Sequence, residues 1–500
     1  MNKRLIRSSK LLSVFIVTIM LFAFVATFSM TVSAETPSVT STVATNQGLV
    51  LGETYQRHNF ESGGRDWVFW CNGSAIVYSS STDSNTWASP RIFSSYVCNE
   101  GVYCCNGSSF SLWYDVTTNY AHIAYMNVTG TQQSIWYARI APQSNGLITS
   151  DDPQEAVPGV ASLNFSVPSI CLNSLGYPYI AYMATDINTA NLSGYVSTST
   201  VNSSGTWTNA TNSTIDCATL LNASVEISYP SVIPVTSGNV SIQYAYYNVD
   251  EDLFGQNYAQ YNVSDDSWWY ADKVDILDTP SNLTYSWKHS EVAYSSANNT
   301  DDVFVICSIY DDAAGELLLA TSYGNVTTPF NISYFNSLSY GNWTGALSIR
   351  DTNGNLTATV INDSALNSIW TAEYNMGTMQ WGTLTDVNLV SSTSEGIMSA
   401  YRHNTSLGFL YYQNVIQYLN ENLNYGCYGC TPVVVPATVP AAVSTMAQMI
   451  AILVGAIIIF MLLGYAFVEI KNNGITEAVG VTFVGIIGLI VIEIIIAATL

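Results

Sequence analysis

Basic residues are the scarcest charged groups in this chain of 500 residues. It has 13 Lys and Arg against 36 Asp and Glu, and only 4 His, which gives a formal net charge of −23. Four of the basic residues fall within the first ten positions, so the rest of the chain has a net charge of −27. A surface of this charge repels phosphate backbones, so the composition argues against nucleic acid as a partner.

Several signatures of catalysis are also missing from the sequence. It has no Gly-rich phosphate loop, no H-E-x-x-H helix and no G-x-S-x-G elbow. Acidic clusters that include Asp250, Asp252, Asp311 and Asp312 could offer oxygen ligands to Ca²⁺, but none has the spacing of an EF-hand loop, and solvated turns are the default explanation. We therefore expect no cofactor, with Ca²⁺ as the one ion left open.

The N-terminus has the pattern of an export signal. Basic residues precede an apolar stretch from Leu11 to Met30, and Val32-Ser33-Ala34 supplies the small residues that signal peptidases recognise. We predict a cleaved signal peptide over residues 1–34, with an uncleaved anchor as the alternative.

Two long apolar runs stand at the C-terminus, at residues 446–468 and 478–500. Each is long enough to cross ~30 Å of hydrocarbon as a helix. We predict an α-helical transmembrane hairpin that partners the lipid bilayer and leaves the large domain, residues 35–420, outside the cell membrane.

Residues 421–445 read as a neck between the large domain and the membrane, kept extended by Pro432, Pro436 and Pro440. Cys427 and Cys430 in this segment have the spacing of a redox or zinc motif. No second ligand pair lies nearby, so we favour a local disulfide.

The large domain is rich in Asn-x-Ser/Thr sequons, of which the sequence has nineteen. Their spread over this domain, and their absence after residue 404, fit an exported glycoprotein, although Asn also marks β-turns. The representative candidates for glycosylation are Asn72, Asn106, Asn127, Asn164, Asn191, Asn222, Asn262, Asn325, Asn355 and Asn404.

Seven short runs with β-strand character recur every 50–60 residues or so, and each is followed by a second such run. The first members of these pairs include WVFWC from Trp67, HIAYM from His122 and, in the last pair, GFLYY from Gly408. The second member of the last pair is VIQYLN from Val415. Tryptophans at matching corners, among them Trp87 and Trp207, are expected to pack between neighbouring units.

This period, with about four strands per repeat, predicts an all-β fold of the β-propeller class. The last repeat stops near Asn420 after three strands, and the segment Leu49–Tyr55 could supply its outer strand and close the ring. Seven blades are favoured over six. Tandem β-sandwiches are the alternative, but linkers every ~100 residues are missing.

The segment from Ser81 to Trp87, STDSNTW, resembles the Asp-box, S-x-D-G-x-T-W. It keeps Ser81, Asp83, Thr86 and Trp87 and has Ser84 in place of the glycine. The chain thus resembles the sialidase-type propellers with BNR repeats and, with its anchor and sequons, archaeal cell-surface proteins. The resemblance implies that the box braces a turn at a blade's outer edge.

Sialidase chemistry implies three convergent arginines and a tyrosine–glutamate pair. Repeat alignment puts Arg57 early in an innermost strand but Arg350 and Arg402 near the far ends of theirs, so they should not converge. No catalytic residue is assigned on this basis.

Three basic–histidine pairs fall in the first strand of a repeat, which lines a propeller's centre. They are candidates for binding an anionic group, unless they only neutralise nearby carboxylates. The pairs are Arg57 and His58, Lys288 and His289, and Arg402 and His403.

The sequence favours a non-catalytic recognition or adhesion protein that binds surface glycans or envelope proteins. The alternatives are a glycoside hydrolase of sialidase type or a lyase, either acting through carboxylates at the centre of the propeller, and a structural surface-coat protein.

Overall fold

The computed structural model describes residues 38–47, 55–95, 107–129 and 132–199, and beyond these mainly the strands between residues 207 and 428 whose bounds follow. The chain divides into two compact units, Met1–Pro432 and Val433–Leu500, and the strands belong to the first. No helix long and apolar enough to span a membrane occurs among the described residues. The predicted signal peptide, most of the neck and both apolar C-terminal runs lie outside them.

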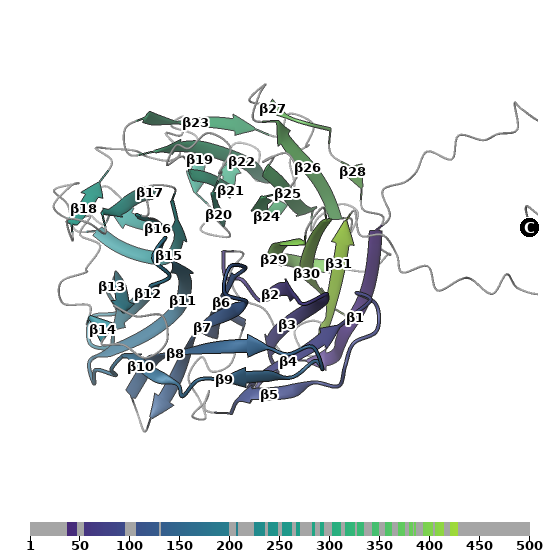
Figure 1. Cartoon of the computed structure of the whole chain (residues 1–500). Helices are drawn as coiled ribbons and strands as arrows, with labels where there is room; N and C mark the ends of the chain where they lie inside the picture. Colours follow the sequence, from purple (N-terminus) through teal and green to yellow (C-terminus); the bar gives the residue numbers. More distant parts are fainter. Residues whose placement is uncertain are drawn as a thin grey trace, which may run out of the picture. The chain divides into compact units, whose positions relative to one another are not determined.

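Seven antiparallel sheets of four or five strands make up the first unit (Figure 1). We number them as blades 1–7 in chain order. Blade 1 has β2 (Asn59–Ser62), β3 (Arg65–Cys71), β4 (Ile76–Ser81) and β5 (Arg91–Ser94). Blade 2 has β6 (Phe110–Asp115), β7 (Tyr120–Thr129), β8 (Gln132–Pro142), β9 (Ile148–Ser150) and β10 (Gln154–Val157), preceded by the 3₁₀ turn η1 (Gly107–Ser109). Blade 3 has β11 (Leu163–Leu172), β12 (Pro178–Asp186), β13 (Leu192–Ser199) and β14 (Trp207–Thr208).

The second half of the ring repeats this plan. Blade 4 has β15 (Val225–Pro234), β16 (Val240–Asn248), β17 (Leu253–Asn262) and β18 (Ser267–Tyr270). Blade 5 has β19 (Leu283–Tyr285), β20 (Glu291–Tyr294), β21 (Val303–Asp311), β22 (Glu316–Asn325) and β23 (Thr328–Tyr334). Blade 6 has β24 (Trp343–Ile349), β25 (Leu356–Asn362), β26 (Ile369–Asn375), β27 (Gln380–Trp381) and β28 (Thr385–Asp386). Blade 7 has β29 (Ser394–His403), β30 (Ser406–Asn414), β31 (Glu421–Tyr428) and β1 (Ser38–Gln47).

Strands of neighbouring sheets pack against one another around the whole ring, including β2 of blade 1 against β29 of blade 7. The fold is a seven-bladed β-propeller, and the predicted all-β class is confirmed. Each of the seven first runs of the sequence repeat lies within the strand that pairs with the innermost strand of its blade, as WVFWC does in β3 and VFVIC does in β21.

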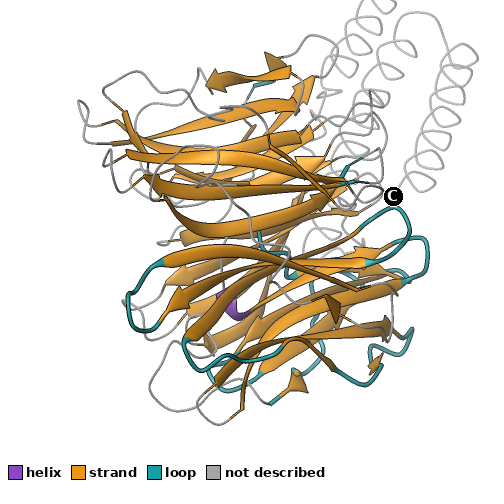
Figure 2. Ribbon diagram, turned by 90° about the vertical axis from the view of Figure 1, so that its left-hand side faces the viewer, coloured by secondary structure: helices purple, strands orange, loops and turns teal. Residues whose placement is uncertain are grey.

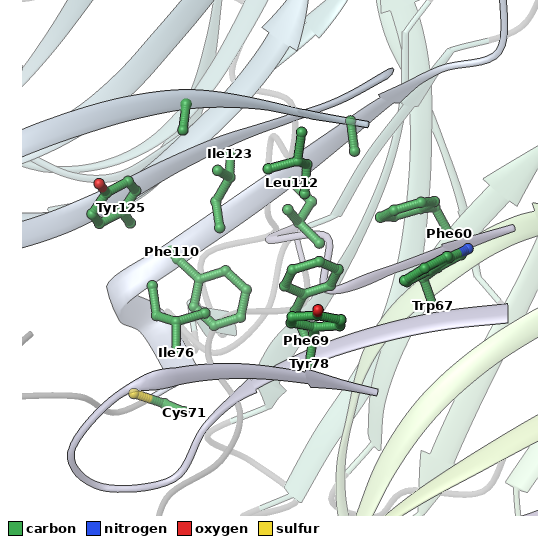
Figure 3. Packing of buried hydrophobic residues seen from close by; sticks show 13 residues of the cluster. Phe60, Trp67, Phe69, Cys71, Ile76, Tyr78, Phe110, Leu112, Ile123 and Tyr125 are labelled. Carbon is green, nitrogen blue, oxygen red and sulfur yellow. The ribbon is translucent and has the colours of Figure 1, made fainter. Parts of the chain in front are cut away.

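Both faces of a blade are buried, which explains why the run in β3 is apolar throughout. Trp67 and Phe69 face a cluster shared with blade 2, and Val68 and Trp70 face a cluster shared with blade 7. Figure 3 shows the first cluster, in which Phe69 lies close to Tyr78. Side chains of a strand alternate between its two faces, so each buried face needs its own apolar residues.

The strand that closes the ring differs from the one expected. It is β1, which pairs with β31 from Ser38 opposite Tyr428 to Gln47 opposite Glu421, rather than the segment Leu49–Tyr55. The third strand of blade 7 is β31 rather than the run that begins at Val415. The last blade therefore continues past residue 420, into the segment that the sequence assigned to the neck. Figure 2 shows the strands from the side of the ring.

Candidate functional site at the inner wall of the ring

The segment that leads into β2 lies against the innermost strands of blades 2 and 3. The Leu112 N–H of β6 donates to the Arg57 carbonyl at 2.8 Å. The Gln56 side-chain amide donates to the carbonyl oxygens of Ser108 and Pro168, each at 2.9 Å. Because Pro168 belongs to β11 of blade 3, this segment joins three blades at the inner wall of the ring.

Arg57 places its guanidinium over an aromatic ring at this wall. Its Cζ atom is 4.5 Å from the ring centroid of Trp113, which lies in β6 and is partly exposed, as Arg57 is. Cys171 of β11 lies near enough for the Arg57 charge to oppose the rise in its thiol pKa that burial causes. We call Gln56, Arg57 and Trp113 the wall cluster. A cation held on the face of an indole is suited to an anionic ligand.

His58 does not join Arg57 in this role, contrary to the sequence-based expectation. Its side chain is fully buried, stacks on Phe110 at 4.2 Å between centroids, and its Nε2 lies 3.1 Å from the Phe110 carbonyl oxygen. Burial lowers the pKa of His58 to about 3, although the bond to the Phe110 carbonyl opposes this shift. His58 is thus packed at the interface between blades 1 and 2, and its burial there keeps the imidazole neutral.

The other members of the predicted binding set are less completely placed. Lys288 and His289 lie outside the described residues, whereas Arg402 and His403 end β29, the innermost strand of blade 7. Of the Ca²⁺ candidates, Asp311 ends β21, while Asp250, Asp252 and Asp312 lie outside the described residues. Within the described part of the chain, no three His, Cys, Asp or Glu residues lie together in a way that could hold a metal ion.

The Asp-box forms the turn that its resemblance implies, between the third and fourth strands of blade 1. Asp83 Oδ1 accepts hydrogen bonds from the N–H groups of Asn85 at 3.0 Å and Thr86 at 2.6 Å, and from the Ser81 hydroxyl at 2.8 Å. Burial alone would raise the pKa of Asp83, but these bonds outweigh it and lower the pKa to about 2. Ser84, at the glycine position of the box, has a φ of 57°.

Two of the tryptophans at recurring corners, Trp87 and Trp207, pack between blades, as predicted. The Trp207 ring lies 5.0 Å from that of Tyr137 in the preceding blade, and its indole N–H donates to Gln154 at 3.2 Å. Trp87 meets Tyr425 of blade 7 edge to face at 5.2 Å. Both contacts are structural.

A second buried histidine, which the sequence did not single out, lies in β7. His122 Nδ1 is 2.7 Å from the Tyr137 hydroxyl, and both residues are about 1% exposed. Burial lowers the pKa of His122 to about 4, assisted by Arg139 and opposed by Asp115. Inaccessibility to solvent makes this pair part of the packing rather than a site.

The described sequons differ in accessibility. Asn72 and Asn191 are exposed, whereas Asn127 is 6% exposed and Asn164 is intermediate. Asn72 Oδ1 accepts hydrogen bonds from the Ser74 N–H and hydroxyl and from the Ala75 N–H, so its turn role and a glycan on its amide nitrogen are compatible. The other named sequons lie in segments or side chains that the structure does not describe, apart from Asn262 and Asn325, which end β17 and β22.

Among the described residues, one cysteine is disulfide-bonded and another is free. Cys71, at the end of β3, is disulfide-bonded, and Cys171 is free and buried. Cys427 lies within β31, where it pairs with Val39 and Gly408, and its proposed partner Cys430 lies outside the described residues.

Two residues of the wall cluster, Gln56 and Trp113, were not identified as site candidates from the sequence. Trp113 stands in FSLWYD, where it reads as one more core aromatic, and Gln56 carries no charge. The Pro168 carbonyl that accepts from Gln56 belongs to a Ser-x-Pro-Ser segment in β11, and the same pattern recurs in β15 at Ser228–Ser231. The pairings of β11 with β12 and of β15 with β16 each have a bulge at this segment. The repeated Ser-x-Pro-Ser segment was a signal available in the sequence.

No protein-family model matches the chain, and no curated protein matches it. Solved structures do. A polysaccharide lyase of family PL25, an ulvan lyase, matches with a TM-score of 0.54 and 12% identity over 77% of this chain and 95% of that chain. Its complex with -[GlcA(1-4)Rha3S]- matches with a TM-score of 0.53 at 11% identity, over the same shares of 77% and 95%. The polysaccharide lyase Uly1 matches with a TM-score of 0.51 and 9% identity over 78% of this chain and 98% of that chain.

At these identities the likeness establishes a shared fold. It also corrects the favoured functional interpretation, because the matching folds belong to glycan-cleaving enzymes rather than to non-catalytic recognition or adhesion proteins. The chain is a seven-bladed propeller similar in fold to polysaccharide lyases.

Proposed function

We propose that the chain is a glycan-processing enzyme that acts on an acidic polysaccharide at the inner wall of the ring. The observation that carries this proposal is the Arg57 guanidinium 4.5 Å from the Trp113 ring centroid. A guanidinium pairs with carboxylate or sulfate through two parallel hydrogen bonds, and the indole beneath it holds the cation in place. Together they suit a charged sugar residue.

The fold supports the substrate class by analogy. The ulvan lyase with this fold binds -[GlcA(1-4)Rha3S]-, a ligand that carries both a carboxylate and a sulfate. Function belongs to sites rather than to folds, so the analogy gains weight only because Arg57 and Trp113 lie at the inner wall.

Between hydrolysis and elimination, we favour elimination from a uronate. Hydrolysis by the common route uses two carboxyl groups about 5–9.5 Å apart on either side of the glycosidic bond. Three described carboxylates near blades 1 and 2 have structural tasks instead: Asp66 accepts from Ser84, Asp115 accepts from the Thr117 N–H, and Asp151 pairs with Arg139.

Elimination instead requires a positive charge at the uronate carboxylate, which Arg57 can supply. A base removes the proton beside the uronate carboxylate, the electrons form a C=C bond, and the glycosidic C–O bond breaks as its oxygen takes up a proton. A cation at the carboxylate stabilises the charge that develops there. Arg57 is assigned this role, and no base is assigned among the described residues.

We also propose export and membrane anchoring. The Cys71 disulfide supports the oxidising compartment that the signal peptide predicts, because disulfides persist mainly outside the cytosol.

The test is incubation of the purified full-length protein with uronate-containing and neutral polysaccharides. Elimination leaves an unsaturated uronate that absorbs in the ultraviolet, whereas hydrolysis releases reducing ends without this absorbance. New ultraviolet absorbance with a uronate polymer is the expected result. Reducing ends alone would favour a hydrolase, and no cleavage of any acidic polymer would overturn the proposal.

A further inference from the structure

Residues 55–58, which lead into β2, cross the inner wall without forming a strand. Within this segment the Arg57 N–H donates to Ser111 Oγ at 3.3 Å, and the Arg57 carbonyl accepts from the Leu112 N–H at 2.8 Å. Both partners belong to β6, so these bonds set the position of Arg57 along blade 2. The guanidinium lies over Trp113 of β6, and its charge also acts on the thiol of Cys171 in β11. Its place therefore depends on blade 3 as well as on blade 2.

Gln56 ties the same segment to both blades at once. Its side chain is fully buried. An amide nitrogen of this kind has two N–H groups to donate. In Gln56 it lies 2.9 Å from the Ser108 carbonyl oxygen, in the turn that precedes β6, and 2.9 Å from the Pro168 carbonyl oxygen of β11. Because one planar group serves two blades, it fixes the segment between them at the residue next to Arg57.

The blade 3 partner of Gln56 stands in a strained bulge. The pairing of β11 with β12 passes from Ser166 directly to Ser169, so Val167 and Pro168 have no opposite residue in β12. Val167 has a φ of 53°, which β-branched residues rarely adopt and which a following proline makes still less favourable. Strain of this kind persists only where the surrounding structure holds it, and it often marks functional positions. In β11 it coincides with the carbonyl that accepts from Gln56.

Blade 4 holds the other side of this bulge. The Val232 N–H of β15 donates to Ser169 Oγ at 3.2 Å, and Ser169 is fully buried. The Pro168 carbonyl is thus fixed by packing against the next blade before it receives the Gln56 amide. A group that must hold a charged side chain in one place needs a support of this rigidity.

We propose that Gln56 is a positioning residue for Arg57. By tying the chain to blade 3, it holds the guanidinium over Trp113, where the anionic group of the substrate binds. A buried amide suits this role because it adds no negative charge that would compete with the substrate for Arg57. The inference rests on the proposed function and adds to it a requirement outside the residues that touch the substrate.

Gln56→Met tests the role in catalysis, because methionine fills a similar space but donates no hydrogen bond. Formation of unsaturated product from a uronate polysaccharide is measured for the wild type, Gln56→Met, Arg57→Ala and the double variant. We expect Gln56→Met to lower kcat by about 10- to 100-fold and to change KM less, since misplacement of Arg57 weakens mainly the interaction with developing charge. In the Arg57→Ala background the same substitution should lower kcat less than about twofold. An equal loss in both backgrounds would refute the positioning role.

Gln143→Met is the matched control. Gln143 is exposed in the β8–β9 connection, where its amide donates to the Ala141 carbonyl at 3.2 Å, and its replacement should leave kcat unchanged. A loss as large as that of Gln56→Met would count against the proposal. Near-ultraviolet circular dichroism shows whether each variant is folded. If Gln56→Met is not, Gln56→Asn takes its place, because the shorter side chain cannot reach both carbonyls from the same backbone position.

A second measurement needs no substrate and so separates this inference from the proposed function. Denaturant unfolding of Arg57→Ala, Trp113→Leu and the double variant gives the coupling energy between the cation and the ring. The cycle is then repeated in the Gln56→Met background, where we expect the coupling to fall towards zero. Unchanged coupling would overturn the positioning role even if the protein cleaves the polysaccharide. Loss of coupling in a protein that cleaves no acidic polymer would support the role and refute only the proposed function.

Discussion

The indole N–H of Trp87 donates a 2.8 Å hydrogen bond to Ser41 Oγ, which joins the Asp-box of blade 1 to the strand that closes blade 7. The same hydroxyl donates to the Ser84 carbonyl at 2.7 Å. The Tyr425 hydroxyl reaches Asp66 at 3.1 Å beside it. In this chain the box therefore helps to hold the ring closed as well as bracing its own turn.

We expect Trp87→Phe to lower the free energy of unfolding by about 1–2 kcal/mol, because the phenyl ring keeps part of the packing but leaves Ser41 without its donor. Chemical denaturation of the wild type, both single variants and the double variant with Ser41→Ala measures the coupling. Substitutions that share this bond should not add, with a coupling of about 0.5–1.5 kcal/mol. Additive effects would show that the bond contributes nothing to closure.

Ser84 combines a positive φ with a hydrogen bond, so two substitutions separate its roles. Ser84 Oγ donates to Asp66 Oδ2 at 2.6 Å while φ is 57°. Both Ser84→Ala and Ser84→Gly lose the bond, but glycine adopts this conformation without steric cost. We expect the glycine variant to be more stable than the alanine variant by about 1 kcal/mol in denaturant unfolding. The opposite order would refute the conformational explanation.

The two buried histidines predict a loss of stability in mild acid. The pKa values of His58 and His122 fall from 6.5 to about 3 and about 4, so below pH 6.5 the unfolded state takes up protons that the folded state does not. Stability should decrease as the pH falls from 6.5 towards 4, by roughly 2 kcal/mol per histidine at pH 5.

Denaturant unfolding at pH 7 and pH 5 measures this effect, with His122→Gln as the comparison. The variant should lose less stability between the two pH values than the wild type, whatever its stability at pH 7. Asp83 does not confuse the result, because its contribution is lost only as the pH falls below 3.8 towards about 2. Equal pH dependence in both proteins would contradict the assignment.

The described cysteines should differ in reactivity. Cys171 is free but fully buried, and burial raises its pKa, so both access and thiolate formation are suppressed. We expect it to resist alkylation in the folded protein and to react after unfolding, as mass spectrometry of the Cys171 peptide would show. Reduction of the Cys71 disulfide should lower stability by about 2–5 kcal/mol. Rapid native labelling of Cys171 would contradict its buried position.

The sequence predicted the ring because each blade's second strand is packed on both faces and must be apolar. The runs at Trp67 and His122 therefore stand out, and they form parts of β3 and β7. The closing strand did not stand out. Its sequence, SVTSTVATNQ, has no aromatic residue, and half of its partner ENLNYGCY is polar or glycine. An outer strand has fewer apolar neighbours, so its sequence carries a weaker signal.

Site prediction failed at His58 for a related reason. A basic–histidine pair looks solvent-exposed in a sequence, yet the carbonyl of His58 accepts the Phe69 N–H at 2.8 Å and its ring stacks on Phe110. Arg57, one residue earlier, reaches the inner wall. Which member of the pair is buried depends on the packing of blade 2 against blade 1, which no local pattern encodes.

Cleavage of a uronate polysaccharide by the Arg57→Ala variant, compared with wild type and the Arg91→Ala control, tests the central claim most directly. Arg91 is exposed in β5, an outermost strand, so its loss should leave the rate of unsaturated product formation unchanged. Loss of one group that stabilises developing charge typically costs about 10²–10³ in kcat, and we expect Arg57→Ala to fall in this range. Equal rates for the Arg57→Ala variant and the wild type would contradict the account.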